Sequence, residues 1–171
     1  MKSSQRALTW HLNREGLSNE IIEDFATHAN IDAHFAGVYH MHELPSHLPR
    51  SRAEFSIIIN IDNHWTTLYW SNTYILYIDS FGEGMPSAVE VYVKKFCEPH
   101  QAILFNNHPI QDKTSTHCGL FSMLFILFFD RKAKASDPYI FNNVVHLRFS
   151  ECNLLLNDQL CLKYIECLLY T

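Results

Sequence analysis

The chain has 171 residues, of which 47% are hydrophobic and 18% charged, so it can bury a substantial core and is neither a disordered segment nor a repeat array. Its formal net charge of −5 gives no general attraction for nucleic acid, although Arg131, Lys132 and Lys134 form a small basic cluster. No linker or repeat divides the sequence, and we expect one domain over residues 1–171 that acts as a monomer.

The five cysteines are an odd number without a C-x-x-C pair, and no secretory signal precedes them. This pattern favours free thiols in a reducing, intracellular compartment. The longest apolar run, Gly119 to Phe129, is too short to cross a bilayer, which predicts a soluble protein without membrane contact.

The first half of the chain predicts one helix, an irregular segment and a small antiparallel sheet. Ser18 has the character of an N-cap and opens an amphipathic helix that ends near His28. Residues 31–49 mix aromatics, Gly37 and two prolines, which favours an irregular surface segment. The predicted strands are 55–61, 66–70 and 73–79, and Ser71-Asn72 forms a hairpin turn between the last two.

The second half of the chain is mostly helical. Pro86 is suited to the first turn of a helix that carries Val89, Val93 and Phe96 on one face. A short strand is expected at Ala102–Phe105, followed by a loop over residues 106–117.

Three further helices are predicted towards the C-terminus. They run from Cys118 to about Asp130, from Asp137-Pro138 to Phe149, and onward from Asn157. The order of elements indicates an α+β fold around a small, largely antiparallel sheet.

Cys118 lies where a polar loop meets a buried helix. All residues from Gly119 to Phe129 are apolar except Ser122. Unpaired N–H groups and the helix dipole at such a position favour a thiolate over a thiol, which makes Cys118 a candidate nucleophile. The alternative is that Cys118 is a small buried hydrophobic side chain, as many cysteines are.

His64, Asp79 and Gln111 can complete a catalytic site with Cys118. If strands 66–70 and 73–79 pair as a hairpin, His64 and Asp79 become neighbours, so that a carboxylate can orient the imidazole that activates the thiol. The Cys118 N–H and the Gln111 amide can then stabilise an oxyanion. The alternatives are that Asp79 only caps a turn, that Gln111 is exposed, and that His64 is one of eleven unremarkable histidines.

These residues occur in an order that resembles the adenovirus-type processing cysteine proteases (adenain-like) and the SUMO-deconjugating proteases of the same clan. The motifs are His64-Trp65, Asp79 within I-D-S-F-G, and Gln111 seven residues before C-G-L-F. The segments H-F-A-G-V-Y, N-H-W-T-T-L-Y-W and N-D-Q-L-C-L-K-Y-I are also similar, so the resemblance covers roughly residues 35–170. It implies a papain-like-clan fold with a small, mostly antiparallel sheet flanked by helices.

The resemblance implies a thiol endopeptidase (a hydrolase) that cleaves a polypeptide after Gly-containing motifs, most naturally viral structural precursors during virion maturation. Cys118 is then the nucleophile, His64 the general base and acid, Asp79 the orienting member of the triad, and Gln111 the oxyanion donor. Trp65 would wall the substrate cleft, and its alternative role is a core aromatic. The alternative functions are deconjugation of ubiquitin-like proteins and a non-catalytic virion component. A viral enzyme would be found in the host nucleus or the virion.

The chain also departs from the adenoviral pattern. It has Asp79 where those enzymes generally have Glu. The SUMO-deconjugating relatives have Asp at this position. Adenoviral enzymes are stimulated by DNA and by a viral peptide that forms a disulfide. The acidic net charge argues against DNA, and Cys97 is the candidate for the peptide disulfide, with a plain thiol as the alternative.

A metal site is the remaining alternative for the chemistry. It would use His40, His42 and His47, but an H-x-H pair without a spaced cysteine pair is a weak signal. We therefore expect no metal or small-molecule cofactor.

Overall fold

The computed structural model describes residues 17–31, 34–48, 53–135 and 153–169. Its centre is a five-stranded sheet whose strands lie in chain order. The three central strands pair antiparallel, whereas each edge strand pairs parallel with its neighbour. The strands are β1 (Phe35–His40), β2 (Phe55–Ile61), β3 (His64–Trp70), β4 (Tyr74–Asp79) and β5 (Ala102–Phe105).

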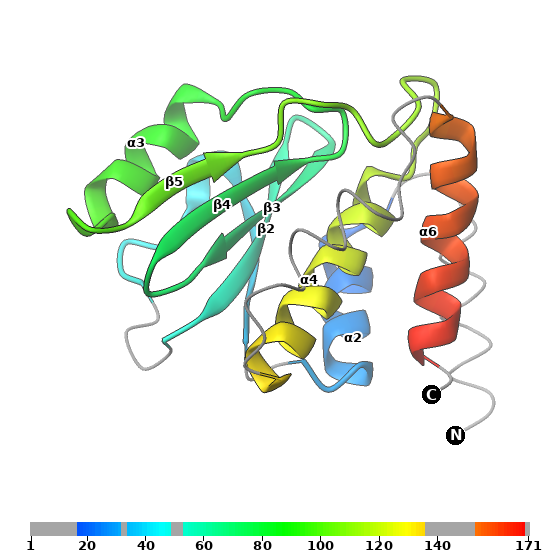
Figure 1. The fold of residues 1–171 in the computed structure, drawn as a ribbon, viewed down its shortest axis with the longest axis horizontal. Coiled ribbons are helices and arrows are strands. Elements are labelled where there is room, and N and C mark those ends of the chain that lie inside the picture. The colour runs from blue at the N-terminus through cyan, green and yellow to red at the C-terminus, as the bar shows by residue number, and fades with distance from the viewer. Residues whose placement is uncertain (1–16, 32–33, 49–52, 136–152, 170–171) are drawn as a thin grey trace.

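Helices cover both faces of this sheet (Figure 1). One face carries α3 and a short 3₁₀ turn, η1, and the other carries α4, which separates the sheet from α6 and also contacts α2. The helical bounds are α2 (Asn19–His28), η1 (Met41–Glu43), α3 (Ser87–Phe96), α4 (Cys118–Ala135) and α6 (Leu154–Leu169). The mixed fold, a small sheet flanked by helices, agrees with the prediction. The sheet itself is not mostly antiparallel as predicted, because the two antiparallel pairings in its centre are matched by two parallel pairings at its edges.

Each face of the sheet supports its own hydrophobic core. Along β3, Trp65 and Tyr69 face the core shared with α4, and Leu68 and Trp70 face the core shared with α3. A strand that is covered on both faces needs apolar residues in succession, which explains why the central strands do not alternate with polar residues. The two cores therefore fix the sheet from both sides.

Several predicted elements are confirmed. The first helix begins after Ser18, whose hydroxyl accepts a hydrogen bond from the Ile21 N–H at 3.4 Å. The strand at Phe55–Ile61 and the strand at Ala102–Phe105 have the predicted bounds. In each case the signal is local, because a cap or a short apolar run is contained within a few residues.

The prediction of an irregular segment over residues 31–49 was wrong, since this segment contains β1. Gly37 has a φ of 120°, and the pairing of β1 with β2 shifts register between Phe35 and Val38. This bulge removes the regular alternation by which a strand is recognised in sequence. Its partner strand, β2, also lies further along the chain, so the pairing is not visible in the local sequence.

The hairpin turn between β3 and β4 lies one residue later than predicted. The Ser71 N–H donates to the Tyr74 carbonyl at 3.0 Å, so the two central turn residues are Asn72 and Thr73. The Ser71 hydroxyl also donates to that carbonyl, at 2.8 Å. Ser71 therefore closes the turn and does not form its tip.

Two helix bounds also differ from the prediction. Helix α4 continues to Ala135, and α6 begins at Leu154 after Asn153, whose side-chain oxygen accepts the Leu156 N–H at 3.1 Å. Asn157 lies inside α6 and is fully buried, so it is not the cap that was predicted. The helix predicted from Asp137-Pro138 to Phe149 lies outside the described residues.

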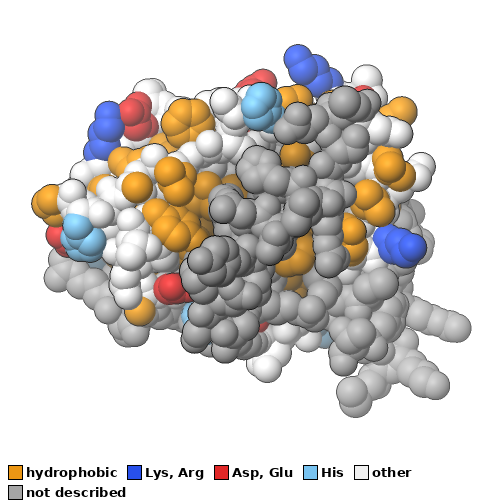
Figure 2. Space-filling model, viewed as in Figure 1, with side chains coloured by type: hydrophobic (Ala, Val, Ile, Leu, Met, Phe, Trp, Pro, Cys, Tyr) orange, Lys and Arg blue, Asp and Glu red, His pale blue; other side chains and the backbone are white. Residues whose placement is uncertain are grey.

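Strand β5 contributes less to the cores than the other strands do. Figure 2 shows hydrophobic side chains gathered over the left part of this face, where β5 and α3 lie in Figure 1. The large exposed hydrophobic side chains of these two elements are Val91, Leu104 and Phe105. Among the described helices, none combines the length and the apolar character that a bilayer crossing needs.

Replacing Phe121 with alanine should reduce the free energy of unfolding by about 3–5 kcal/mol, because its ring is fully buried in the α4 core and leaves a cavity. Urea denaturation followed by circular dichroism measures the change. Val91, whose side chain is 68% exposed on α3, supplies the control, and Val91→Ala should change stability by less than about 0.5 kcal/mol. Equal losses in the two variants would contradict this assignment of the core.

Candidate active site

His64 and Asp79 meet at the open end of the β3–β4 hairpin. Strand pairing sets Thr66 opposite Asp79, and His64 Nε2 lies 2.8 Å from Asp79 Oδ1. The turn that precedes His64 is tight, because Asp62 and Asn63 both have positive φ, of 50° and 71°. Such a turn matches the twist of the flanking strands and makes His64 the first residue of β3. The two side chains are thus neighbours, as the sequence predicted.

Cys118 is the second group that acts on the His64 ring. It is the first residue of α4, it is 8% exposed, and it lies close enough to His64 to raise the pKa of the ring. Because Nε2 is occupied by Asp79, Nδ1 is the ring nitrogen that remains for the thiol. The fold thus brings the candidate nucleophile, base and acid close together.

The environment of His64 favours the protonated ring. Burial by itself lowers the pKa, but the hydrogen bonds and charges of Asp79 and Cys118 outweigh it and raise the pKa of His64 to about 9. At neutral pH the ring is therefore an imidazolium, which is the form that stabilises a neighbouring thiolate and that can give a proton to a leaving group.

Asn106, which sequence reasoning missed, holds the backbone of Asp79. Its side-chain oxygen accepts the Asp79 N–H at 2.8 Å, and its amide nitrogen donates to the Asp79 carbonyl at 2.6 Å and to the His108 carbonyl at 3.1 Å. Asn106 follows β5 directly, and the parallel pairing of β5 with β4 brings it to the end of β4. In sequence it is indistinguishable from a turn residue, since Asn107 and a Pro follow.

The turn after β4 supports the imidazole from a second direction. The Phe81 ring stacks on the His64 ring, with centroids 4.7 Å apart and planes 18° from parallel, and the Phe81 N–H donates to Asp79 Oδ1 at 2.7 Å. Gly82 has a φ of +71°, and a Cβ there would lie 2.5 Å from the His108 carbonyl carbon. Glycine therefore allows the loop around His108 to pass close beneath this turn.

Gln111 is fully buried, so the alternative of an exposed amide was wrong. Its side-chain oxygen accepts the Ser80 hydroxyl at 2.6 Å, and its amide nitrogen donates to the Ser115 carbonyl at 2.8 Å. The amide thus lies between the turn that carries Asp79 and the loop that leads to Cys118. Its role as an oxyanion donor stays a prediction.

Helix α6 holds the loop on both sides of Gln111. The Asn157 amide donates to the Ile110 carbonyl at 2.9 Å, and Asp158 Oδ2 lies 3.7 Å from His117 Nδ1. The Ser115 hydroxyl also lies against the Asp158 carboxylate. The C-terminal helix therefore fixes the segment that ends at the candidate nucleophile.

Trp65 is 4% exposed and belongs to the core on the α4 side. A Cβ on Gly119 would lie 3.1 Å from Trp65 Cδ1 and 2.8 Å from Leu17 Cδ1, so the first turn of α4 packs closely on the indole. This is the contact of a core aromatic beside the candidate nucleophile. Its predicted role in substrate binding is untested by this geometry.

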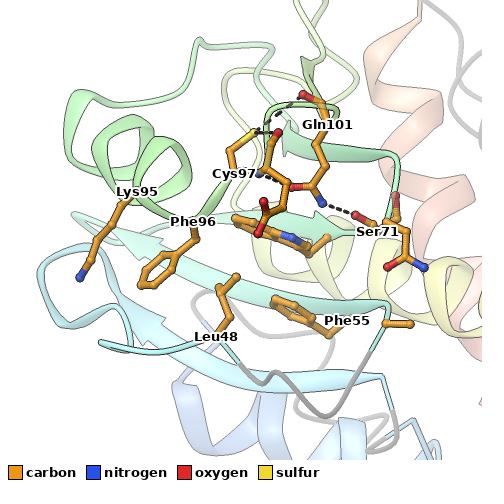
Figure 3. Close-up of a pocket in the computed structure, with 11 residues that line it drawn as sticks. Leu48, Phe55, Ser71, Lys95, Phe96, Cys97 and Gln101 are labelled. Carbon is orange, nitrogen blue, oxygen red and sulfur yellow. Dashed lines mark hydrogen bonds between the residues drawn. The ribbon is translucent and has the colours of Figure 1, made fainter.

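Cys97 lines a separate cavity of about 720 Å³ near the end of α3 (Figure 3). Its Sγ lies 3.5 Å from the Glu98 carbonyl and 3.8 Å from the Gln101 carbonyl, and burial, with the Glu98 charge, raises the pKa of its thiol. Leu48, Phe55 and Phe96 form part of the wall, and no candidate catalytic residue does. Cys97 is thus a free thiol with no feature that activates it.

The alternative metal site gains no support from the described part of the chain. Within it, no group of three or more His, Cys, Asp or Glu side chains is arranged to hold a metal ion. His40 and His42 have ring centroids 5.6 Å apart in a tilted arrangement.

The fold is shared with known cysteine proteases. A crystal structure of the ASFV pS273R protease matches with a TM-score of 0.62 and 16% identity, over 86% of this chain and 68% of that chain. A de-sumoylating protease matches with a TM-score of 0.52 and 13% identity, over 95% and 85% of the two chains. The SUMO protease Ulp1 matches with a TM-score of 0.51 and 16% identity, over 94% and 83%.

The chain therefore has the fold of the papain-like clan of cysteine proteases, as the motifs implied. No protein-family model matches the sequence, and no curated protein matches it. The particular resemblance to adenoviral enzymes remains an inference from the motifs, because these structures represent another viral protease and the SUMO proteases.

Asp79→Asn should lower the pKa of His64 from about 9 towards the ordinary value of 6.5, because the amide no longer stabilises the imidazolium by charge. The measurement is an NMR titration of the His64 ring, assigned by comparison with His64→Gln. Asp62→Asn, in the exposed turn before β3, is the matched control and should leave the titration unchanged. A His64 pKa that stays near 9 in Asp79→Asn would show that the carboxylate is not its main support.

Asn106→Ala should destabilise the protein by about 1–3 kcal/mol, because the Asp79 N–H and carbonyl lose their side-chain partner. The His64 pKa should fall as well, since Asp79 is no longer held in register. Urea denaturation and the same NMR titration measure the two effects. Asn72→Ala, at an exposed hairpin position, is the control, and a similar result for both variants would refute the clamp.

Proposed function

We propose, from the fold shared with cysteine proteases, that this chain is a cysteine endopeptidase. The observation that carries the proposal is the position of His64, which hydrogen-bonds with Asp79 and lies close enough to Cys118 for both groups to raise the pKa of its ring. A structural histidine–carboxylate pair needs no thiol at the second nitrogen. A thiol at the first residue of a helix is also where a thiolate is stabilised.

In this proposal the Cys118 thiolate attacks the carbonyl carbon of the scissile peptide bond. The carbonyl oxygen gains the negative charge, and the Cys118 N–H and the Gln111 amide donate hydrogen bonds to it. The His64 imidazolium gives its Nδ1 proton to the leaving amine as the C–N bond breaks, which leaves a thioester on Cys118. A water molecule then loses a proton to His64 and hydrolyses the thioester, which restores the thiolate and the imidazolium.

We propose that the substrate is a polypeptide with glycine next to the scissile bond. The support for this preference is the resemblance of the His64-Trp65, I-D-S-F-G and C-G-L-F motifs to proteases that cleave after Gly-containing motifs. The close contact between Gly119 and the buried Trp65 is internal packing and does not decide the substrate. The favoured substrates are viral structural precursors processed during virion maturation, in the nucleus of the host cell or in the virion.

The alternative substrate is a conjugate of a ubiquitin-like protein, which also ends in glycine. This alternative is favoured by the likeness to a de-sumoylating protease and to SUMO protease Ulp1, and by an aspartate at position 79. A virion component that retains the fold without turnover is the non-catalytic alternative.

We propose Cys97 as the residue through which an activating peptide would attach. The thiol lines a cavity, as attachment would require, but its raised pKa makes disulfide formation slow without a catalyst. We expect DNA to contribute little, because phosphate binding needs clustered basic residues and the net charge is −5. We also propose that the chain acts as a monomeric single domain in a reducing compartment.

Cys118→Ala and His64→Ala should each abolish cleavage of a fluorogenic peptide that ends in Gly-Gly before the reporter, while the circular dichroism spectrum stays unchanged. Cys97→Ala is the control and should retain activity, because its thiol lines a cavity without any of the proposed catalytic residues. A Gly-Gly electrophile, followed by mass spectrometry, should label Cys118. Labelling of another cysteine, or activity in His64→Ala, would overturn the assignment.

Comparison of two substrate types separates the two active functions. A precursor peptide with an internal Gly-containing site reports endopeptidase activity, and an intact SUMO conjugate reports deconjugation. Faster turnover of the peptide supports precursor processing, whereas turnover of the conjugate alone supports the deconjugase. If neither substrate is cleaved and no electrophile reacts at Cys118, the non-catalytic alternative stands.

A further inference from the structure

Ser80 lies between Asp79 and Phe81. Its contacts hold a second part of the candidate site, the segment that carries Gln111. Its side chain is 2% exposed, and its hydroxyl donates to Gln111 Oε1 at 2.6 Å. Its carbonyl accepts the Ile110 N–H at 2.8 Å and the Gln111 N–H at 2.9 Å. Ser80 thus holds both the backbone and the side chain of Gln111.

The orientation of the Gln111 amide follows from its two buried partners. The Ser115 carbonyl can only accept a hydrogen bond, so the group that faces it at 2.8 Å must be the NH₂ group. Oε1 then faces Ser80, and the Ser80 hydroxyl must donate to it. A flipped amide would set its oxygen against the Ser115 carbonyl oxygen. Ser80 and Ser115 together therefore select one orientation.

This orientation leaves one amide proton weakly held. Gln111 Nε2 lies 3.3 Å from Ser115 Oγ, which is a longer contact than the 2.8 Å to the Ser115 carbonyl. A hydrogen bond accepted by Oε1 also polarises the amide and makes its N–H groups stronger donors. The second proton is therefore the one that can be redirected to an oxyanion at low cost.

We propose that Ser80 is the positioning residue for Gln111, and that its hydroxyl orients the amide as the oxyanion donor. This inference rests on the proposed endopeptidase function and adds a residue to it. The segment Asp79-Ser80-Phe81 then aligns two parts of the site at once. Asp79 and Phe81 hold the His64 ring, and Ser80 holds the Gln111 amide.

The test compares Ser80→Ala with Ser56→Ala. Ser56 is the matched control, because it is also 2% exposed and its hydroxyl donates to a backbone carbonyl, that of His34. We expect Ser80→Ala to lower kcat about tenfold with little change in KM, and Gln111→Ala to lower kcat on the order of 10²-fold. Ser56→Ala should leave kcat unchanged, and Ser80→Thr, which keeps the hydroxyl, should restore most of the loss.

Two further readouts separate positioning from general damage. The double variant Ser80→Ala/Gln111→Ala should be no slower than Gln111→Ala, because Ser80 acts through that amide. Alkylation of Cys118 by iodoacetamide should keep its rate in Ser80→Ala, because alkylation develops no oxyanion. Additive losses in the double variant, or a parallel loss of alkylation, would overturn the proposal.

NMR of the Gln111 side-chain amide gives a readout that does not depend on turnover. Its two NH₂ resonances should shift in Ser80→Ala, return in Ser80→Thr and stay unchanged in Ser56→Ala. If the unmodified protein cleaves nothing, the proposed function fails, and these resonances alone decide whether Ser80 orients Gln111; unchanged resonances would refute it. If Ser80→Ala does not fold, Ser80→Cys replaces it, since a thiol keeps the bulk but donates weakly.

Discussion

The hydrogen bond between the His64 ring and the Asp79 carboxylate depends on the register of the β3–β4 hairpin. A slip of one residue would turn every side chain of β3 to the opposite face and separate the two groups. The slip is prevented by the cores on both faces, since Tyr69 must reach α4 and Trp70 must reach α3. The geometry of the candidate site is therefore a consequence of core packing, and the polar residues only complete it.

Helix α4 is both a central part of the hydrophobic core and the element that carries the candidate nucleophile, Cys118. It lies between the sheet and α6, and from Gly119 to Phe129 its side chains are apolar on every side except for Ser122 and are almost all buried. Because a helix in such an environment is rigid, the thiol at its first residue is held firmly against His64. The same burial explains why most of the polar contacts of the site come from the loops and turns around it.

The sequence predicted the features that depend on local patterns. The cap at Ser18, the apolar run at Phe55–Ile61 and the proximity of His64 to Asp79 all follow from residues close in the chain or from one hairpin. Strand β1 could not be predicted, because it pairs parallel with β2 and its bulge at Gly37 hides the alternation.

The supporting residues of the site could not be predicted for a related reason. Asn106 and Asn157 bind backbone groups that folding brings to them from other parts of the chain, and an asparagine in sequence does not reveal such a partner. Ser80 belongs to the same group, although it is next to Asp79. Gln111 was predicted as a site residue from its motif, but the partners that hold it in the interior, Ser80 and Ser115, and the Asn157 contact to the neighbouring Ile110 carbonyl could not be read from the sequence.

The two glycines that follow β4 differ in what surrounds them. Gly82 lies against the His108 backbone, whereas a Cβ on Gly84 would meet nothing within 4 Å, and Gly84 is exposed. The backbone is therefore tightly packed at Gly82, whereas open space surrounds Gly84. An insertion, such as a short tag or a new loop, is best accommodated at Gly84, where it lengthens the connection to α3 without moving the turn that holds the imidazole.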